Sequence, residues 1–474
     1  MPEHKTLVMK FGGTSVGSVD ALNSVEQIVK DARVNFSRVV VATSAMSGVT
    51  NLLLDSAARA AQGQVDSLPA AESSLREKHF NAADALITNA ALRDSIKSEI
   101  GALLQTLLDL CRAIAVLGEA SPRALDAVAS LGERMSARLL AGVLQSAGVP
   151  AQALESTQFI ITNDNYQNAH PNFALTAEKT RAALHPLLDE GIVPVVTGFI
   201  GATPQGIITT LGRGGSDYSA AVLGAVLPAD DVWIWTDVDG VMSADPRLVP
   251  DAQTIAEITY NEIAELAYYG AKVIHPKTIR PVVDAGIGLR ICNTFNPSQP
   301  GTRLVANGEN LSQPRPRMIR AVTAIRSQRL ITIEGRGMLG VPGVAARAFG
   351  AVASTKTSVP LITQASSEQS ICFAIPSESA SAVLDSLQTV FSRELREQDI
   401  DRIWMTEDVS IITVVGVGMR YTPGVSGKVF SKLGERGVNV LAIAQGSSEV
   451  AISMVVASAD TESAVKTLHE LVVS

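Results

Sequence analysis

A lysine and two glycines follow a short apolar run near the start of the chain. The run is Thr6–Lys10, and it leads into the turn KFGGTS at Lys10–Ser15. Glycines let the backbone approach an anion and point its N–H groups at it, and the positive end of a following helix adds to this attraction. A Gly-Gly pair alone is more often an ordinary tight turn. Together with the lysine charge and two hydroxyl groups, it predicts a phosphate-binding turn.

A second glycine-rich loop holds an arginine. The stretch LGRGGSDYS covers Leu211–Ser219, with Arg213 between glycines and Asp217 leading into an Ala-rich segment. An arginine can bind a carboxylate through two parallel N–H bonds, and Asp217 could orient a lysine or a metal. A simple helix cap would explain Asp217 but not Arg213. The loop therefore predicts a carboxylate-binding site.

Three further stretches carry weaker signals. They are the small-residue turn Thr43–Gly48, the Asp-Gly stretch Trp235–Gly240 and the stretch Tyr269–Pro276, which places Lys272 beside a glycine. Each has an ordinary structural explanation when taken alone: a Ser-rich loop, an Asp-Gly turn and a solvated surface lysine.

Strands and helices that alternate along the chain would position these turns. Strand-like apolar runs occur at Thr6–Lys10, Arg38–Thr43, Ile192–Thr197 and Val232–Thr236. Helical patterns cover Asp20–Arg33 and much of 51–138. This alternation predicts an α/β fold with a mostly parallel sheet covered by helices on both faces. Ligands bind at the carboxyl ends of the strands in such sheets, which is where the turns lie.

The last third of the chain contains an internal duplication. A Pro- and Gly-rich stretch at Asn296–Pro316 predicts a domain boundary. Beyond it, Ile331–Met338 aligns with Ile412–Met419, and Gln364 aligns with Gln445 at the same offset. Each copy reads as strand, Gly-Met loop, helix, strand, turn and strand. The offset exceeds the period of solenoid repeats, so two copies of one small domain are expected.

Composition excludes several classes of function. The 474 residues carry a formal charge of −8, with 46% hydrophobic and 4% aromatic residues. A chain without a basic region and with few aromatic rings is not expected to bind nucleic acid. Its three cysteines and six histidines show no metal-ligand spacing. No signal peptide and no apolar run long enough to span a bilayer are recognised, so we expect a cytoplasmic protein with no protein-built metal site and no membrane contact.

Together the motifs resemble aspartate kinases of the amino-acid-kinase superfamily over essentially the whole chain. The resemblance rests on eight stretches: KFGGTSV (Lys10–Val16), SGVTNLL (Ser47–Leu53), SLGERMS (Ser130–Ser136), GFIG (Gly198–Gly201), TTLGRGGSDYSAA (Thr209–Ala221), WTDVDGV (Trp235–Val241), DPR (Asp245–Arg247) and GAKVIHP (Gly270–Pro276). The duplicated units resemble the paired ACT regulatory domains of that family. The resemblance implies a three-layer αβα kinase domain at 1–300 and ACT domains at 317–395 and 396–461, with 462–474 considered as a completing segment of the first.

The resemblance also assigns roles to single residues. Lys10 would contact the ATP phosphates and the transferring group as a catalytic residue, together with Asp217. Arg213 would hold the substrate α-carboxylate and Glu133 its α-ammonium. Four more residues would complete the aspartate pocket: Ser44, Thr50, Phe199 and Ser216. The nucleotide side would comprise Lys10, Gly12, Gly13, Thr236, Asp237, Met242, Arg247, Lys272 and Val273. Met242 is a departure, because the family usually has a tyrosine there.

The implied reaction is transfer of phosphate from ATP, with Mg²⁺, to the side-chain carboxylate of L-aspartate. This would be the first step toward lysine, threonine and methionine. The regulatory copies resemble those of the threonine-sensitive aspartokinase–homoserine dehydrogenases, so Gln364 and Gln445 are expected to contact an allosteric amino acid, with threonine favoured over lysine. ACT pairing would give a homodimer or homotetramer. The sequence leaves open whether the chain is a monofunctional enzyme or the kinase part of a fusion.

Two rival functions are retained. One is a kinase for another acidic amino acid, which the SLGE stretch and the paired ACT copies disfavour. The other is a non-catalytic amino-acid-sensing subunit, which would be expected to lack Lys10, Arg213 or Asp217. All three residues are present.

Overall fold

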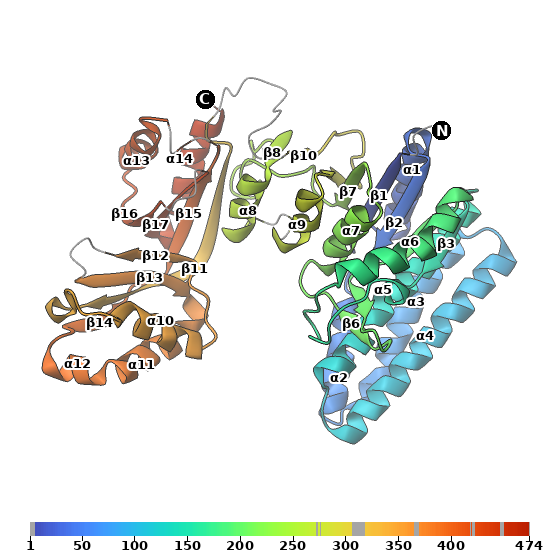
Figure 1. The fold of residues 1–474 in the computed structure, drawn as a ribbon, viewed down its shortest axis with the longest axis horizontal. Coiled ribbons are helices and arrows are strands. Elements are labelled where there is room, and N and C mark those ends of the chain that lie inside the picture. Colours follow the sequence, from blue (N-terminus) through green and yellow to red (C-terminus); the bar gives the residue numbers. More distant parts are fainter. Residues whose placement is uncertain are drawn as a thin grey trace. The chain divides into compact units, whose positions relative to one another are not determined.

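The structure of the chain is a computed structural model. It describes residues 5–271, 274, 276–305, 318–364, 369–417, 419, 422–445 and 450–473. Contacts divide the chain into two compact units, each described by itself (Figure 1). The first comprises Met1–Val241, Ala256–Tyr260 and Ile274–Asn310, and the second comprises Met242–Ile255, Asn261–Val273 and Leu311–Ser474.

An eight-stranded sheet forms the centre of the first unit. Its strand order is β3-β4-β2-β1-β7-β9-β10-β8, and all neighbours are parallel except β9 and β10. The strands are β1 (Thr6–Phe11), β2 (Arg38–Thr43), β3 (Ala151–Leu154), β4 (Val193–Thr197), β7 (Asp231–Thr236), β8 (Glu257–Thr259), β9 (Gly288–Asn293) and β10 (Thr302–Val305). β1 and β4 are buried along their whole length, as expected for central parallel strands covered on both faces. A separate hairpin joins β5 (Ile200–Ala202) to β6 (Ile208–Thr210).

Helices connect the strands. They are α1 (Val19–Asn35), α2 (Val49–Ala61), α3 (Leu68–Leu86), α4 (Ala90–Leu117), α5 (Pro122–Ser146), α6 (Phe173–Asp189), α7 (Gly215–Val226) and α9 (Pro276–Asp284). Of these, α1, α5, α6 and α7 pack on the sheet, α2, α3 and α4 pack on α5, and α9 packs on α7. α5 is buried along most of its length and contacts β3 and β4, whereas α7 contacts β1 and β7. The α/β class predicted from the sequence is confirmed.

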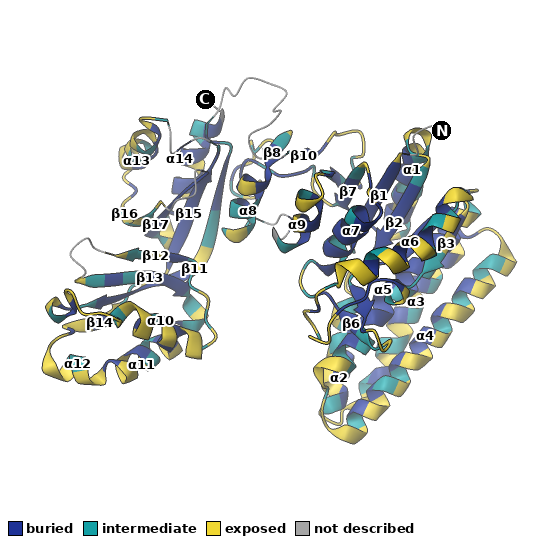
Figure 2. Cartoon of the chain, viewed as in Figure 1, coloured by how far each residue is buried: buried dark blue, intermediate teal, exposed yellow. Residues whose placement is uncertain are grey.

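The helix α4 differs from the expectation that no apolar segment is long enough to span a membrane. It is long and apolar enough to cross a membrane by length and composition alone, although a core helix passes the same test. Its residues Ile100, Leu104, Leu107 and Cys111 lie in the main core, and Figure 2 shows buried and exposed residues alternating along it. Packing against α5 and α3 therefore accounts for its apolar stripe.

The second unit contains one sheet shared by the two regulatory copies. Its order is β12-β13-β11-β15-β17-β16, with β14 also paired to β11. The strands are β11 (Ala321–Glu334), β12 (Leu361–Gln364), β13 (Ser370–Pro376), β14 (Arg402–Met405), β15 (Val409–Val415), β16 (Val440–Ala444) and β17 (Ala451–Ala457). The helices are α8 (Tyr260–Tyr268), α10 (Val344–Ser354), α11 (Ala380–Val390), α12 (Ser392–Glu397), α13 (Val425–Glu435) and α14 (Thr461–Val473). The predicted element order of each copy is observed, while its Gln-x-Ser-Ser-Glu turn lies mostly outside the described residues.

Two segments pack with a different regulatory copy from the one predicted for them. The sequence places 396–405 in the second copy, but β14 pairs with Ile331–Glu334 of the first. The sequence considers 462–474 for the first copy, but α14 packs in the core of the second through Ala464 and Leu468. The reason is that β11 is one long strand that serves both copies: Ala321–Ile325 pairs with β15, and Gln328–Glu334 pairs with β13.

The second unit also takes segments that the sequence places in the kinase domain. In Met242–Ile255, Ala244 and Val249 join the core of the second copy, and the Ser243 carbonyl accepts from Val322 N–H at 2.8 Å. The exact domain limits stay a prediction.

Candidate active site

Strand ends at the carboxyl edge of the first unit's sheet are tied together by backbone hydrogen bonds. After β1, Gly12 N–H donates to the Trp235 carbonyl at 3.1 Å. After β2, Ser44 N–H donates to the Phe11 carbonyl at 3.0 Å, and Ser47 N–H donates to the Gly13 carbonyl at 3.0 Å. A Cβ on Gly13 would lie 2.9 Å from the Ala45 carbonyl oxygen. Only glycine therefore lets the turns after β1 and β2 approach this closely.

Lys10 forms a mostly buried ion pair at this edge. Its Nζ lies 2.6 Å from Asp217 Oδ1, and the two side chains are 11% and 19% exposed. Lys10 is the next-to-last residue of β1, and Asp217 lies in the first turn of α7. The pair fixes the lysine at the strand end, with its charge partly removed from water.

The arginine loop is shaped by glycines and by Phe199. Gly212 and Gly214 have φ of 78° and 71°, and Gly214 caps α7. Phe199 also has a left-handed φ of 66°, which is unusual for a residue with a bulky side chain. Its carbonyl accepts from Leu211 N–H at 2.9 Å, and its ring packs so closely that a Cβ on Gly215 would lie 2.6 Å from it. The strained phenylalanine thus sets the path of the loop that carries Arg213.

Glu133 presents an unsatisfied carboxylate oxygen. It projects from α5, is 3% exposed, and accepts from Ala45 N–H through Oε1 at 3.1 Å. Its Oε2 has no hydrogen-bond partner. Burial raises the pKa of Glu133 to about 8, while the Ala45 bond and the charge of Lys10 lower it in part. A buried carboxylate oxygen without a donor favours a cationic ligand group.

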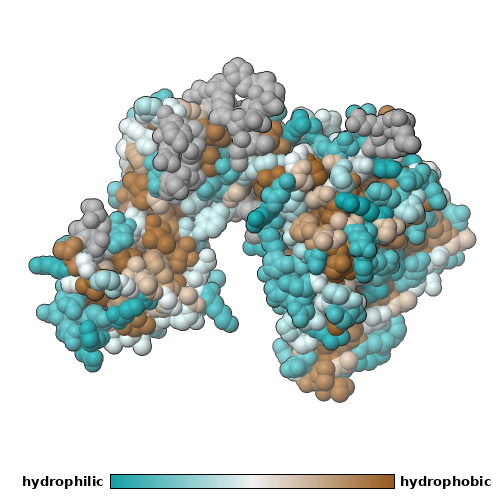
Figure 3. All heavy atoms as spheres, viewed as in Figure 1, coloured by the Kyte–Doolittle hydropathy of each residue, from teal (hydrophilic) through white to brown (hydrophobic). Residues whose placement is uncertain are grey.

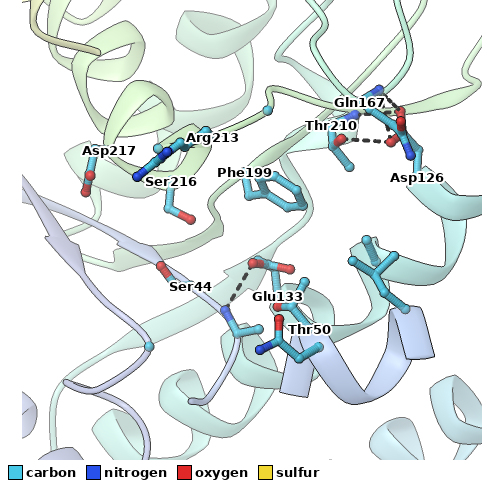
Figure 4. A pocket seen from close by; sticks show the side chains of 18 of the residues that line it. Ser44, Thr50, Asp126, Glu133, Gln167, Phe199, Thr210, Arg213, Ser216 and Asp217 are labelled. Carbon is cyan, nitrogen blue, oxygen red and sulfur yellow. Dashed lines mark hydrogen bonds between the residues drawn. The ribbon is translucent and has the colours of Figure 1, made fainter. Parts of the chain in front are cut away.

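These side chains surround one cavity of about 560 Å³ (Figure 4). Every residue predicted to be catalytic or to bind substrate lines it: Lys10, Ser44, Thr50, Glu133, Phe199, Arg213, Ser216 and Asp217. Figure 4 shows Arg213, Ser216 and Asp217 at the start of α7, with Glu133 and Thr50 across the cavity. The cavity can therefore offer a cation for a carboxylate and an anion for an ammonium group.

The residues predicted for the nucleotide side are more dispersed. Gly12 and Gly13 follow β1, and Thr236 and Asp237 stand at the end of β7, where the Thr236 hydroxyl donates to Asp237 at 3.2 Å. Two others belong to the second unit. There Met242 accepts from the Thr254 hydroxyl at 3.5 Å, and the exposed Arg247 pairs with Asp245 at 2.6 Å. Lys272 and Val273 lie outside the described residues.

Among the cavity residues for which the sequence predicted no role, three are joined by hydrogen bonds. Asp126 of α5 accepts from Gln167 and Thr210, and all three line the cavity. Burial raises the pKa of Asp126, and the bonds from these two residues lower it in part. The spacing of Asp126 and Glu133 on one helix is the available signal, because residues seven apart share a helix face.

A smaller cavity of about 400 Å³ lies in the first regulatory copy. It is lined by Gln364 at the end of β12 and by Met338 and the turn Gly340–Ala345. Gln445 is exposed and follows β16, and the residues after it, 446–449, are outside the described part of the chain.

Metal coordination by protein alone is not supported in the described ranges. No group of three or more His, Cys, Asp or Glu side chains there could hold an ion.

Comparison with known proteins places the chain in a family. Residues 5–293 match the amino acid kinase family model, and residues 331–391 and 412–471 match the ACT domain model. The lysine-sensitive aspartokinase 3 of Escherichia coli is 35% identical over 465 residues, which are 98% of both chains. The crystal structure of E. coli aspartokinase III in complex with aspartate and ADP superposes with a TM-score of 0.79 at 33% identity, covering 99% of this chain and 100% of that one. The chain belongs to the amino acid kinase family and, within it, to the aspartokinases.

Bifunctional proteins are also similar. A chloroplastic bifunctional aspartokinase/homoserine dehydrogenase 2 of Arabidopsis thaliana is 39% identical over 466 residues, covering 98% of this chain and 50% of that protein. The chain thus spans about half the length of the bifunctional relatives it matches.

Proposed function

We propose that the protein transfers the γ-phosphoryl group of ATP to the side-chain carboxylate of L-aspartate. The observation that carries this proposal is the buried Oε2 of Glu133, which lacks a donor in a cavity also lined by Arg213 and Lys10. An α-ammonium, an α-carboxylate and an anionic acceptor would each meet a group of opposite charge there. The aspartate and ADP bound in the similar E. coli structure further support the assignment.

The chemistry requires charge neutralisation rather than proton abstraction. The aspartate side chain is already ionised at neutral pH, so it can attack without a general base. Arg213 would bind the α-carboxylate and Glu133 the α-ammonium, which leaves the side-chain carboxylate facing Lys10. Lys10, held by Asp217 at 2.6 Å, would then neutralise the oxygens of the transferring phosphoryl group.

The residues present fit ATP with Mg²⁺. Magnesium usually keeps several waters and takes one or two carboxylates plus substrate phosphates, so the lack of a three-carboxylate cluster in the described ranges is compatible with it. Asp217 is the cavity carboxylate nearest Lys10 and would hold the ion, which would neutralise charge on the phosphates. Gly12 and Gly13 would leave the backbone beside Lys10 without side chains, and position 12 lies near that charge, since a Cβ there would be 3.5 Å from Lys10 Nζ.

A hydroxamate-trapping assay with purified protein and ATP tests the substrate. Hydroxylamine captures acyl phosphates, so hydroxamate should accumulate with aspartate and not with glutamate or acetylglutamate. Preference for glutamate would favour the rival amino-acid kinase. No product with any acidic amino acid would favour a non-catalytic sensor.

The regulatory copies are proposed to bind an amino acid. The cavity beside Gln364 supports this, because an amide offers both a donor and an acceptor to a ligand with hydroxyl, ammonium and carboxylate groups. Gln445 would take the same role in the second copy. The E. coli relative is named lysine-sensitive, so threonine and lysine are the two effectors to compare.

Threonine is expected to inhibit the kinase more strongly than lysine. Replacing Gln364→Ala removes hydrogen bonds to the effector and should raise the threonine concentration for half inhibition by about tenfold. Parallel titrations of both amino acids against the wild type and Q364A measure this. Selective inhibition by lysine would contradict the prediction.

Three broader assignments accompany the proposal. The product would enter lysine, threonine and methionine biosynthesis. Pairing of ACT units would give a homodimer or homotetramer, and the enzyme would be cytoplasmic.

Figure 3 shows hydrophilic and apolar residues interspersed over the visible face of the kinase unit.

A further inference from the structure

Two carboxylates on one face of α5 differ in how their oxygens are used. Asp126 lies seven residues before Glu133, close to two helical turns, so both project toward the cavity. They are 1% and 3% exposed. Glu133 keeps one oxygen without a donor, which suits a ligand contact. Asp126 has no such oxygen.

Asp126 is saturated by donors from two separate loops. Its Oδ1 accepts from the Thr210 hydroxyl at 2.7 Å. Its Oδ2 accepts from the backbone N–H groups of Thr210 and Gln167, both at 3.0 Å (Figure 4). Hydrogen bonds to a buried charged group are among the stronger ones in proteins. One side chain of α5 thus fixes the backbone of both loops.

These loops support the arginine loop directly. Thr210 ends β6 and stands three residues before Arg213. Gln167 has a left-handed φ of 67°, and a Cβ on Gly212 would lie 2.9 Å from its carbonyl oxygen. Ala169 N–H donates to the Thr210 carbonyl at 2.9 Å. The turn at Gln167 and the end of β6 therefore form one support behind the arginine loop.

We propose that Asp126 is a positioning residue that sets the spacing between Arg213 and Glu133, and this inference rests on the proposed function. Asp126 anchors the Arg213 loop to the same helix that carries Glu133. It thereby fixes the distance between the cation for the α-carboxylate and the anion for the α-ammonium. Asp126 itself needs no contact with the substrate, because its oxygens are already occupied.

Replacing Asp126→Asn tests this role. Asparagine keeps the shape, but the Gln167 N–H donates to both carboxylate oxygens, at 3.2 and 3.0 Å. Either orientation of the amide therefore turns its NH₂ group toward that donor, which should loosen the loop. The KM for aspartate should rise at least about tenfold, the KM for ATP should stay within about twofold, and kcat should change less than the aspartate KM. Thr210→Val, which removes only the hydroxyl bond, should raise the aspartate KM by a smaller factor.

Glu155→Gln is the matched control. Glu155 is a half-buried carboxylate that follows β3 and pairs with Arg134 and Arg138 of α5 at 2.9 and 2.8 Å, but it does not line the cavity. The E155Q variant should leave the aspartate KM unchanged.

An unchanged aspartate KM in folded D126N would overturn the proposal, as would equal rises in both KM values. If D126N does not fold, Thr210→Val decides by the same criterion. If the wild type phosphorylates no aspartate, the proposed function fails. Calorimetric titration of aspartate into the wild type and D126N then tests the spacing separately, with weaker binding by D126N expected and equal binding overturning it.

Discussion

Lys10→Ala should abolish most phosphoryl transfer while the protein stays folded. Lys10 is the cation at the end of β1, held 2.6 Å from Asp217, and its proposed role is to stabilise charge that develops on the transferring phosphoryl group. Removing one such preorganised group costs about 3 kcal/mol of transition-state stabilisation, or a loss of roughly a hundred- to a thousandfold in kcat. Steady-state kinetics with saturating ATP and aspartate measures the loss.

Lys30→Ala provides the control for Lys10→Ala. Lys30 also forms an ion pair at 2.6 Å, with Glu26 one helical turn away, but on the surface of α1. Such exposed pairs contribute less than about 1 kcal/mol, so K30A should keep full activity and stability. Near-normal turnover by K10A would refute the assignment of Lys10, provided that its thermal unfolding matches that of the wild type.

Glu133→Gln should have the second-largest effect. The proposed contact between Glu133 and the substrate ammonium joins two charges in a buried site, where loss of a charge-assisted hydrogen bond costs about 2–3 kcal/mol. The ratio kcat/KM for aspartate should therefore fall by roughly thirty- to a hundredfold. The KM for ATP should not change, because the proposed role of Glu133 is to bind aspartate and not the nucleotide. A larger rise in the KM for ATP than in the KM for aspartate would contradict this role.

The pH dependence gives an independent readout of Glu133. Burial raises its pKa to about 8, so the free enzyme carries a neutral Glu133 below that pH and a charged one above it. Only the charged form attracts the ammonium group. The ratio kcat/KM for aspartate should therefore fall as the pH is lowered through about 8, since this ratio reports the free enzyme. The corresponding step should be missing in E133Q.

The sequence predicts the strand-end turns well because each is a local signal. The run before Lys10 and the glycines around Arg213 are contiguous motifs. A parallel sheet brings the end of β1 to its carboxyl edge, whereas the Arg213 loop follows the separate β5–β6 hairpin. The structure places Lys10, Arg213 and Asp217 around one cavity. The role of Glu133 was predicted only from the family resemblance, because a single glutamate in an apolar helix does not by itself indicate a ligand contact.

The seven-residue spacing of Asp126 and Glu133 on α5 is the one sequence signal for the support behind the arginine loop, and it does not identify the loops that Asp126 binds. Asp126, Gln167 and Thr210 are separated by more than forty residues in each step, and nothing in the sequence around Gln167 signals its left-handed backbone. The sharing of strand β11 by the two copies also depends on contacts between distant segments, so the sequence did not predict it. The predicted limits 317–395 place all of Ala321–Glu334 in the first copy, whereas its two halves pair with strands of different copies.

Reduction of the product with borohydride tests the central claim most directly. Borohydride converts an acyl phosphate to an alcohol, so the position of the new hydroxyl shows which carboxylate received the phosphate. Protein, ATP and L-aspartate should yield homoserine after reduction, identified by mass spectrometry against standards, and omitting ATP should abolish it. Formation of 3-amino-4-hydroxybutanoate would show phosphorylation of the α-carboxylate, and no alcohol at all would show that aspartate is not the acceptor; either result would contradict the proposed function.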